Sequence, residues 1–216
     1  MTDTVPSTGV RALDEMIGDL PFVEFFGDWE VVKLLFHRFI VEHSGEIEVL
    51  LTQEFGALDT TALRRLSRNL GVRPEASLSR SFSLQSTVEL IRGALATEPP
   101  VAAVVDPYLY APSDPSGYGA LTPVTSALRE LGGRKAVAVF NRVSRFGRRT
   151  PEGGTYHHHS IPVIVELSAS PSVLGARIVK HPSSPPRRVL FSYAEVYGTP
   201  VRGPGQQTRL TAWAGG

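Results

Sequence analysis

A glycine and a lysine in the first third of the chain have the spacing of a phosphate-binding loop. That loop follows the pattern Gly-x-x-x-x-Gly-Lys-Ser/Thr, in which the glycines let the backbone approach a phosphate, the lysine neutralises it and the hydroxyl holds magnesium. Gly27 and Lys33 keep their places, but Val32 replaces the second glycine and Leu34 replaces the hydroxyl residue. Valine does not easily adopt the backbone that glycine permits, and leucine cannot ligate magnesium. We therefore expect no nucleotide, no hydrolysis and no cofactor at this loop.

Acidic residues surround the same loop. Glu24, Asp28 and Glu30 place negative charge around it, and this charge repels a triphosphate. Lys33 is the one base in this stretch and would compensate for them, or it would simply pair with these acids. The charge pattern also favours a loop without nucleotide.

A second segment, from Asn141 to Arg149, is rich in arginine and contains one aromatic ring. Four arginines without an intervening acid surround Phe146, and Arg134 and Lys135 lie just upstream. Guanidinium groups neutralise phosphates and an aromatic ring stacks on an unpaired base, so the pattern favours single-stranded DNA. The alternatives are a solvated loop and a loop that contacts the acidic face of a neighbouring subunit. The candidate DNA-binding residues are Arg134, Lys135, Arg142, Arg145, Phe146, Arg148 and Arg149.

Two further groups of ring side chains stand in or near these loops. Tyr108, Tyr110 and Tyr118 lie in a Pro/Gly-rich segment, where such rings stack on bases or, more often, pack against the protein body. His157 and His159 belong to a run of three histidines and would share one face of a strand. Consecutive histidines alone do not define a ligand geometry, so no metal site is expected.

Strands and helices alternate through most of the chain. Strands are expected at 22–26, 47–52, 81–84, 101–105 and 136–140, with helices at 9–18, 31–43, 60–70, 86–96 and 122–131. Several strands are apolar throughout, which is typical of a parallel sheet covered on both faces. A strand meander is expected at 162–167, 176–180 and 189–193. The sequence thus predicts one α/β domain, residues 1–198, with a mainly parallel sheet, C-terminal antiparallel strands and a flexible tail at 199–216.

Several short motifs follow one another in a family-specific order. They are Ser7-Thr8-Gly9, Leu13-Asp14, Val23-Glu24-Phe25-Phe26-Gly27, Gly153-Gly154 with His159, and Ala176-Arg177-Ile178-Val179-Lys180-His181-Pro182. Their order and spacing over residues 7–198 resemble the core of the RecA/RadA recombinases, the archaeal RadA proteins in particular. The resemblance implies the RecA-like P-loop NTPase fold, with helices on both faces of the sheet.

The resemblance also implies places for individual residues. Glu54 stands where the family has its catalytic glutamate, Asp106 matches the Walker B aspartate, and Asn141 matches the asparagine that ends the next strand. The segments after Asp106 and Asn141 correspond to the two DNA-binding loops of the family. Because the phosphate loop is degenerate, Lys33, Glu54, Asp106 and Asn141 are expected to be vestigial rather than catalytic.

These observations favour a non-catalytic RecA/RadA paralog. It would bind single-stranded DNA, a recombinase, or both, and assist homologous recombination or DNA repair. One alternative is an interaction subunit without DNA binding, which pairs with an active ATPase or with itself as a homo-oligomer. A third, less favoured interpretation is an ATPase with an altered site.

Composition and charge set the remaining limits. The 216 residues include 42% hydrophobic and 20% charged residues, a balance typical of globular domains, and no cysteine for a thiolate metal site or disulfide. No signal peptide or membrane-length apolar stretch is evident, so we expect a cytoplasmic protein without membrane contact. The net charge of +1 hides a split: residues 1–60 hold twelve acids and three bases, the remainder nine acids and nineteen bases. This asymmetry favours an anionic partner for the basic part.

Overall fold

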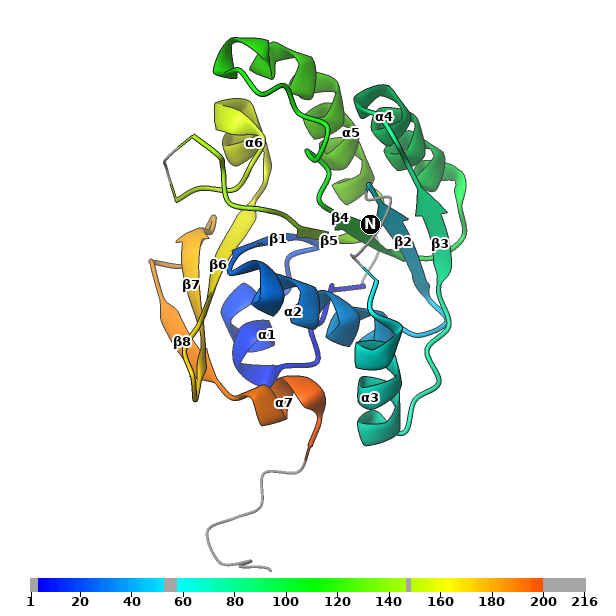
Figure 1. The fold of residues 1–216 in the computed structure, drawn as a ribbon, viewed down its shortest axis with the longest axis vertical. Coiled ribbons are helices and arrows are strands. Elements are labelled where there is room, and N and C mark those ends of the chain that lie inside the picture. The colour runs from blue at the N-terminus through cyan, green and yellow to red at the C-terminus, as the bar shows by residue number, and fades with distance from the viewer. Residues whose placement is uncertain (1–3, 53–57, 147–148, 200–216) are drawn as a thin grey trace, which may run out of the picture.

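The strands assemble into one sheet in the order β3-β2-β4-β5-β1-β6-β7-β8 (Figure 1). The computed structural model describes residues 4–52, 58–146 and 149–199, so the predicted tail lies outside them except for Thr199. The strands are β1 (Phe22–Gly27), β2 (Ile47–Leu51), β3 (Ser77–Arg80), β4 (Val101–Val105), β5 (Ala136–Phe140), β6 (Val163–Ala169), β7 (Leu174–Lys180) and β8 (Arg188–Phe191). β1 to β6 pair in parallel, whereas β7 and β8 are antiparallel. The predicted α/β class and its C-terminal antiparallel strands are confirmed.

Helices cover both faces of this sheet (Figure 1). They are α1 (Arg11–Ile17), α2 (Trp29–Glu42), α3 (Thr60–Leu70), α4 (Leu84–Gly93), α5 (Thr122–Gly132), α6 (Gly154–Ser160) and α7 (Tyr193–Tyr197). One hydrophobic core forms against α1 and α2, and a second forms against α4 and α5 on the other face. Among the described residues, no helix is long and apolar enough to cross a membrane.

The central strands are buried on both sides, which explains their continuous apolar sequences. In β1, Val23 and Phe25 belong to the core against α2, whereas Phe22 and Phe26 belong to the core against α5. β4 and β5 are buried along their whole length in the same way. A parallel sheet between two helical layers therefore shows no polar alternation. This arrangement carries the ends of β1, β4 and β5 to one edge of the sheet.

Two elements differ from the sequence-based expectation. The third predicted strand lies at Ser77–Arg80 instead of 81–84, because Ser83 caps α4 and its hydroxyl accepts a hydrogen bond from the Ser86 N–H. β3 is an exposed edge strand with polar side chains, so burial imposes little pattern on it. The histidine run belongs to the short helix α6, whose N-cap Gly153 and first residue Gly154 have positive φ values of +121° and +77°.

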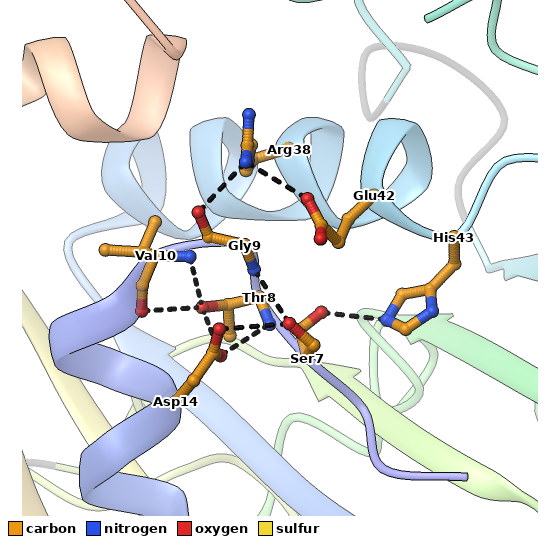
Figure 2. A network of polar contacts seen from close by, with 8 residues as sticks. All are labelled: Ser7, Thr8, Gly9, Val10, Asp14, Arg38, Glu42 and His43. Carbon is orange, nitrogen blue, oxygen red and sulfur yellow. Dashed lines mark hydrogen bonds and ion pairs between the residues drawn. The ribbon is translucent and has the colours of Figure 1, made fainter. Parts of the chain in front are cut away.

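The first motif of the chain holds the N-terminal segment against α1 and α2, as Figure 2 shows. Oδ1 of Asp14 accepts hydrogen bonds from the Thr8 N–H and hydroxyl, both at 2.7 Å, and Oδ2 accepts from the Ser7 hydroxyl at 3.0 Å. Nη2 of Arg38, from α2, donates to the Gly9 carbonyl at 2.9 Å. Gly9 has a φ of +68°, and a side chain there would collide with Arg38. The motif therefore has a structural role in this chain.

Replacing Asp14 by alanine should lower the free energy of unfolding by about 2–3 kcal/mol, because three hydrogen bonds to its carboxylate are lost. Urea denaturation followed by circular dichroism measures the change. Asp19→Ala, which removes an exposed acid just after α1, should change stability by less than about 0.5 kcal/mol. Equal midpoints for the two variants would show that the Asp14 contacts do not stabilise the fold.

Candidate functional site

The segment that resembles a phosphate loop forms the first turns of α2. β1 ends at Gly27, Asp28 is the N-cap, and the helix begins at Trp29. The Asp28 carboxylate accepts a hydrogen bond from the Glu30 N–H at 3.1 Å, and the Val32 N–H donates to the Asp28 carbonyl at 2.9 Å. A phosphate cradle presents its backbone N–H groups to the ligand. Here the Asp28 carboxylate accepts one of the free N–H groups, that of Glu30, whereas the Val32 bond is the first regular hydrogen bond of the helix.

Of the charged residues expected around this turn, Glu24 lies elsewhere. Nζ of Lys33 pairs with Oε1 of Glu30 at 2.8 Å, so the lysine does pair with a neighbouring acid. Glu24 does not add charge around the turn, and that prediction was wrong. Its side chain is completely buried in β1, where Asn141 and His157 contact it.

An arginine lies between the first turn of α2 and the end of β4. Asp106 is buried at the end of β4, and Nε of Arg142 approaches its Oδ2 to 2.5 Å. The guanidinium carbon of Arg142 also lies 4.3 Å from the centre of the Trp29 ring, in the first turn of α2. Guanidinium is a permanent cation, so its hydrogen bond to this carboxyl group is charge-assisted. Glu54, which the resemblance placed at the position of the family's catalytic glutamate, lies outside the described residues.

A buried polar network lies behind this arginine. Oε1 of Glu24 accepts from Nδ2 of Asn141 and from Nε2 of His157, both at 2.7 Å. The Tyr108 hydroxyl contacts Nδ1 of His157 and Oγ1 of Thr125, again at 2.7 Å. Burial raises the pKa of Tyr108 well above its ordinary value. Tyr108 thus packs against the body, and the network joins β1, β5, α5 and α6.

The three histidines of α6 meet three different environments, so the expectation of a shared strand face was wrong. His157 is completely buried in the network, whereas His159 is exposed. Nζ of Lys180 donates to the carbonyls of His158 and His159 at the C-terminal end of the helix. In the described part of the chain, no group of three or more histidine or acidic side chains could hold a metal ion.

The two other described arginines of the loop after β5 also contact acids. Nε of Arg145 lies 3.4 Å from Oε2 of Glu152, and Nε of Arg149 lies 2.5 Å from Oε1 of Glu166. Their side chains remain 41% and 69% exposed, respectively. The two carboxylates are buried, with 4% and 8% of their side-chain surface exposed, so the arginines are the ends of these pairs that face solvent. Arg148 lies outside the described residues.

An aromatic pocket opens beside these arginines. The rings of Tyr118 and Phe146 meet edge to face with centroids 5.3 Å apart, and Phe146 is 37% exposed. Both line a pocket of about 520 Å³. The Tyr118 hydroxyl donates to Oε1 of Glu152, whose Oε2 accepts from the Arg145 N–H at 3.1 Å. Burial raises the pKa of Glu152, and hydrogen bonds from backbone N–H groups oppose this shift. Glu152 therefore ties the loops after β4 and β5 together.

The arrangement of strands and the sheet edge can be compared with solved structures. A crystal structure of the RadB recombinase matches 89% of this chain and 97% of its own with a TM-score of 0.72 and 18% sequence identity. The chain has the RecA/RadA recombinase fold. At this sequence identity, the similarity establishes the fold but not the function. No protein-family model and no curated protein sequence matches the chain.

The RecA/RadA fold places two of the predicted DNA-binding residues away from the others. Arg134 and Lys135 precede β5, whereas Asn141 follows it, so five strand residues separate them by roughly 16 Å. Lys135 is 6% exposed, and its Nζ donates to Thr97 and lies 3.9 Å from Glu48. Neither residue extends the basic loop, and that part of the prediction was wrong, because a strand carries the chain across the sheet.

Sequence reasoning missed Glu152 as a member of this site. It is the one acid between positions 141 and 160, in an otherwise basic stretch. That isolation could have indicated it, because a lone acid among arginines is placed to pair with them. Its contact with Tyr118 depends on the fold and has no signal in the sequence.

Proposed function

We propose that this chain is a non-catalytic protein of the RecA/RadA fold that binds single-stranded DNA through the loop after β5. The carrying observation is the neighbourhood of Arg145, Phe146 and Arg149, where exposed guanidinium groups accompany an exposed ring and its pocket. Guanidinium groups bind phosphates, and an exposed aromatic ring stacks on unpaired bases. The protein of the matching crystal structure is a recombinase. That likeness supports a role in homologous recombination or DNA repair.

The contacts at the Walker positions support the non-catalytic part of the proposal. A carboxylate caps α2 where a phosphate would bind, and Arg142 occupies the carboxylate of Asp106. Calorimetric titration with magnesium-ATP should therefore give no heat beyond dilution. Single-stranded DNA titrated into the same sample is the control for active protein. Micromolar binding of magnesium-ATP would overturn this part and favour an ATPase with an altered site.

A second candidate function is an interaction subunit that binds a recombinase or another copy of itself. Leu78 in the open edge strand β3 and Phe82 just beyond it are 43% and 60% exposed, respectively. Exposed apolar residues on an open sheet edge favour association. Light scattering at low and high salt, alone and with a recombinase, tests this candidate. This candidate is excluded if the protein is monomeric at all salt concentrations and does not bind the recombinase.

A further inference from the structure

We propose that β8 accepts an additional strand from an acidic, extended peptide segment of a partner protein. β8 ends the sheet order, and Figure 1 shows it beside β7 at one end of the sheet. This inference goes beyond the proposed DNA binding, because it concerns a different ligand and a different element. The open backbone edge of β8, the arginines beside it and one exposed leucine together define the ligand.

Two residues of β8 direct their backbone groups away from the sheet. The Arg187 carbonyl accepts a hydrogen bond from the Ile178 N–H at 2.8 Å, and β7 and β8 pair antiparallel from there to Phe191. Hydrogen-bonded pairs alternate with non-hydrogen-bonded pairs in such a ladder, so the N–H and C=O groups of Arg188 and Leu190 face outward. No described residue bonds to these groups. A peptide strand that lies alongside β8 can bond to them.

Arginines outnumber acids on the exposed face of β8 and its neighbours. Arg177 lies directly opposite Arg188, in the type of pair that brings side chains closest. Arg177 and Arg149 share the carboxylate of Glu166, each with an N···O distance of 2.5 Å. In the described part of the chain, Arg188 has no acidic partner. Like charges directly opposite each other destabilise a sheet. A carboxylate beside Arg188 would relieve this repulsion, so the face favours an acidic ligand.

An exposed apolar side chain stands next to this arginine. Leu190 is 58% exposed and lies two residues after Arg188, on the same face of the strand. A Cβ atom at Gly175 would lie 3.5 Å from Nη2 of Arg188 and 3.6 Å from Cδ2 of Leu190, so both side chains border the surface above this glycine. Val189 and Phe191 pack on the opposite face, in the core. An added strand with an acidic and an apolar residue at alternate positions therefore matches β8.

The composition of the two open edges disfavours a second copy of this chain as the ligand. Pairing β8 with β8 would bring arginines together, and β3, at the other end of the sheet, contains Arg80 and no acid. Phosphates of a nucleic acid would also neutralise the arginines. They offer no counterpart to the outward N–H and C=O groups of Arg188 and Leu190, whereas a peptide backbone does. The ligand that fits is therefore an acidic segment of another protein.

Hydrogen exchange of single amides, measured by NMR, tests the addition of a strand. The probe is the synthetic heptapeptide Thr-Glu-Thr-Val-Thr-Glu-Thr, whose acidic and apolar residues share one face in either strand direction. The N–H groups of Arg188 and Leu190 should exchange freely in the protein alone and at least about tenfold more slowly with excess peptide. The Val189 N–H faces β7 and should be protected in both samples. Methylating alternate backbone nitrogens of the peptide should abolish the protection for one set of positions and retain it for the other.

Charge reversal tests the preference for acidic ligands. Arg188→Glu should weaken binding of the peptide about tenfold, because a favourable cross-strand pair becomes a repulsive one. The same variant should bind the peptide with lysine in place of glutamate more tightly than the wild type does. Arg64→Glu, which reverses an exposed arginine on α3, should bind both peptides as the wild type does.

Several results would overturn the proposal. They are equal exchange of the Arg188 and Leu190 amides with and without peptide, equal effects of Arg188→Glu and Arg64→Glu, and equal effects of the two methylated peptides. If an oligothymidine shifts these amide resonances and the peptide does not, the face binds nucleic acid, and the proposal is overturned as well. The DNA binding proposed for the loop after β5 does not depend on the peptide results.

Discussion

Replacing His157 by alanine should lower the free energy of unfolding by about 3 kcal/mol or more, and the melting temperature by roughly 10 °C. The variant leaves the buried Glu24 carboxylate without one of its two partners, because Oε1 accepts from His157 and Asn141. Oε2 of Glu24 already has no hydrogen-bond partner in the described structure. The Tyr108 hydroxyl loses its hydrogen bond with Nδ1 of His157 as well. Thermal denaturation followed by circular dichroism measures the loss.

The same helix supplies the control for this prediction. His159→Ala removes an exposed imidazole two residues further on and should change stability by less than about 0.5 kcal/mol. Adding Glu24→Gln to His157→Ala should recover part of the loss, since it removes the unpaired buried charge. If His157→Ala and His159→Ala have equal melting temperatures, the buried network does not stabilise the fold.

Replacing Arg145 and Arg149 together by alanine should weaken the binding of single-stranded DNA about tenfold to a hundredfold at low salt. Two exposed guanidinium groups that would neutralise phosphates are lost. The slope of the logarithm of the binding constant against that of salt concentration should become shallower by roughly 1.4, because each phosphate contact on a single strand contributes about 0.7. Fluorescence anisotropy over a series of potassium chloride concentrations measures both quantities.

The matched control for charge is a pair of arginines elsewhere. Arg64 and Arg68 are exposed on α3, the helix between β2 and β3. Replacing both by alanine removes the same charge as the loop variant. This variant should keep nearly wild-type affinity and salt slope. An equal loss in both double variants would mean that DNA responds to overall charge and that the loop after β5 is not the binding site.

The central sheet could be predicted from sequence because burial on both sides gives apolar strands a strong local signal. β1, β4 and β5 are such strands, and their ends position Gly27, Asp106 and Asn141 at one edge. The exposed edge strand β3 carries no such signal and was misplaced by four residues. α6 forms from residues with weak helical preference, because the turn at Gly153 and the buried His157 fix it.

The contacts of the candidate site were less accessible to sequence reasoning. The sequence shows that the loop after β5 is basic and contains one aromatic ring. The structure adds that the Phe146 ring contacts Tyr118. The pairs of Arg142 with Asp106 and of Arg145 with Glu152 depend on how loops fold over the sheet edge. Lys135 lies at the other end of β5 because the strand carries the chain across the sheet, and the predicted strand at 136–140 already implied this separation. Residues that flank a strand in the sequence lie at opposite ends of it in the structure.

Binding of single-stranded DNA in the absence of nucleotide is the most direct test of the central claim. Wild-type protein is titrated into a labelled oligothymidine at low salt, with and without magnesium-ATP, and the titration is repeated as salt is raised. The account predicts saturable binding that falls steeply with salt and is the same with and without the nucleotide. No anisotropy change at low salt, or binding that requires magnesium-ATP, would contradict it.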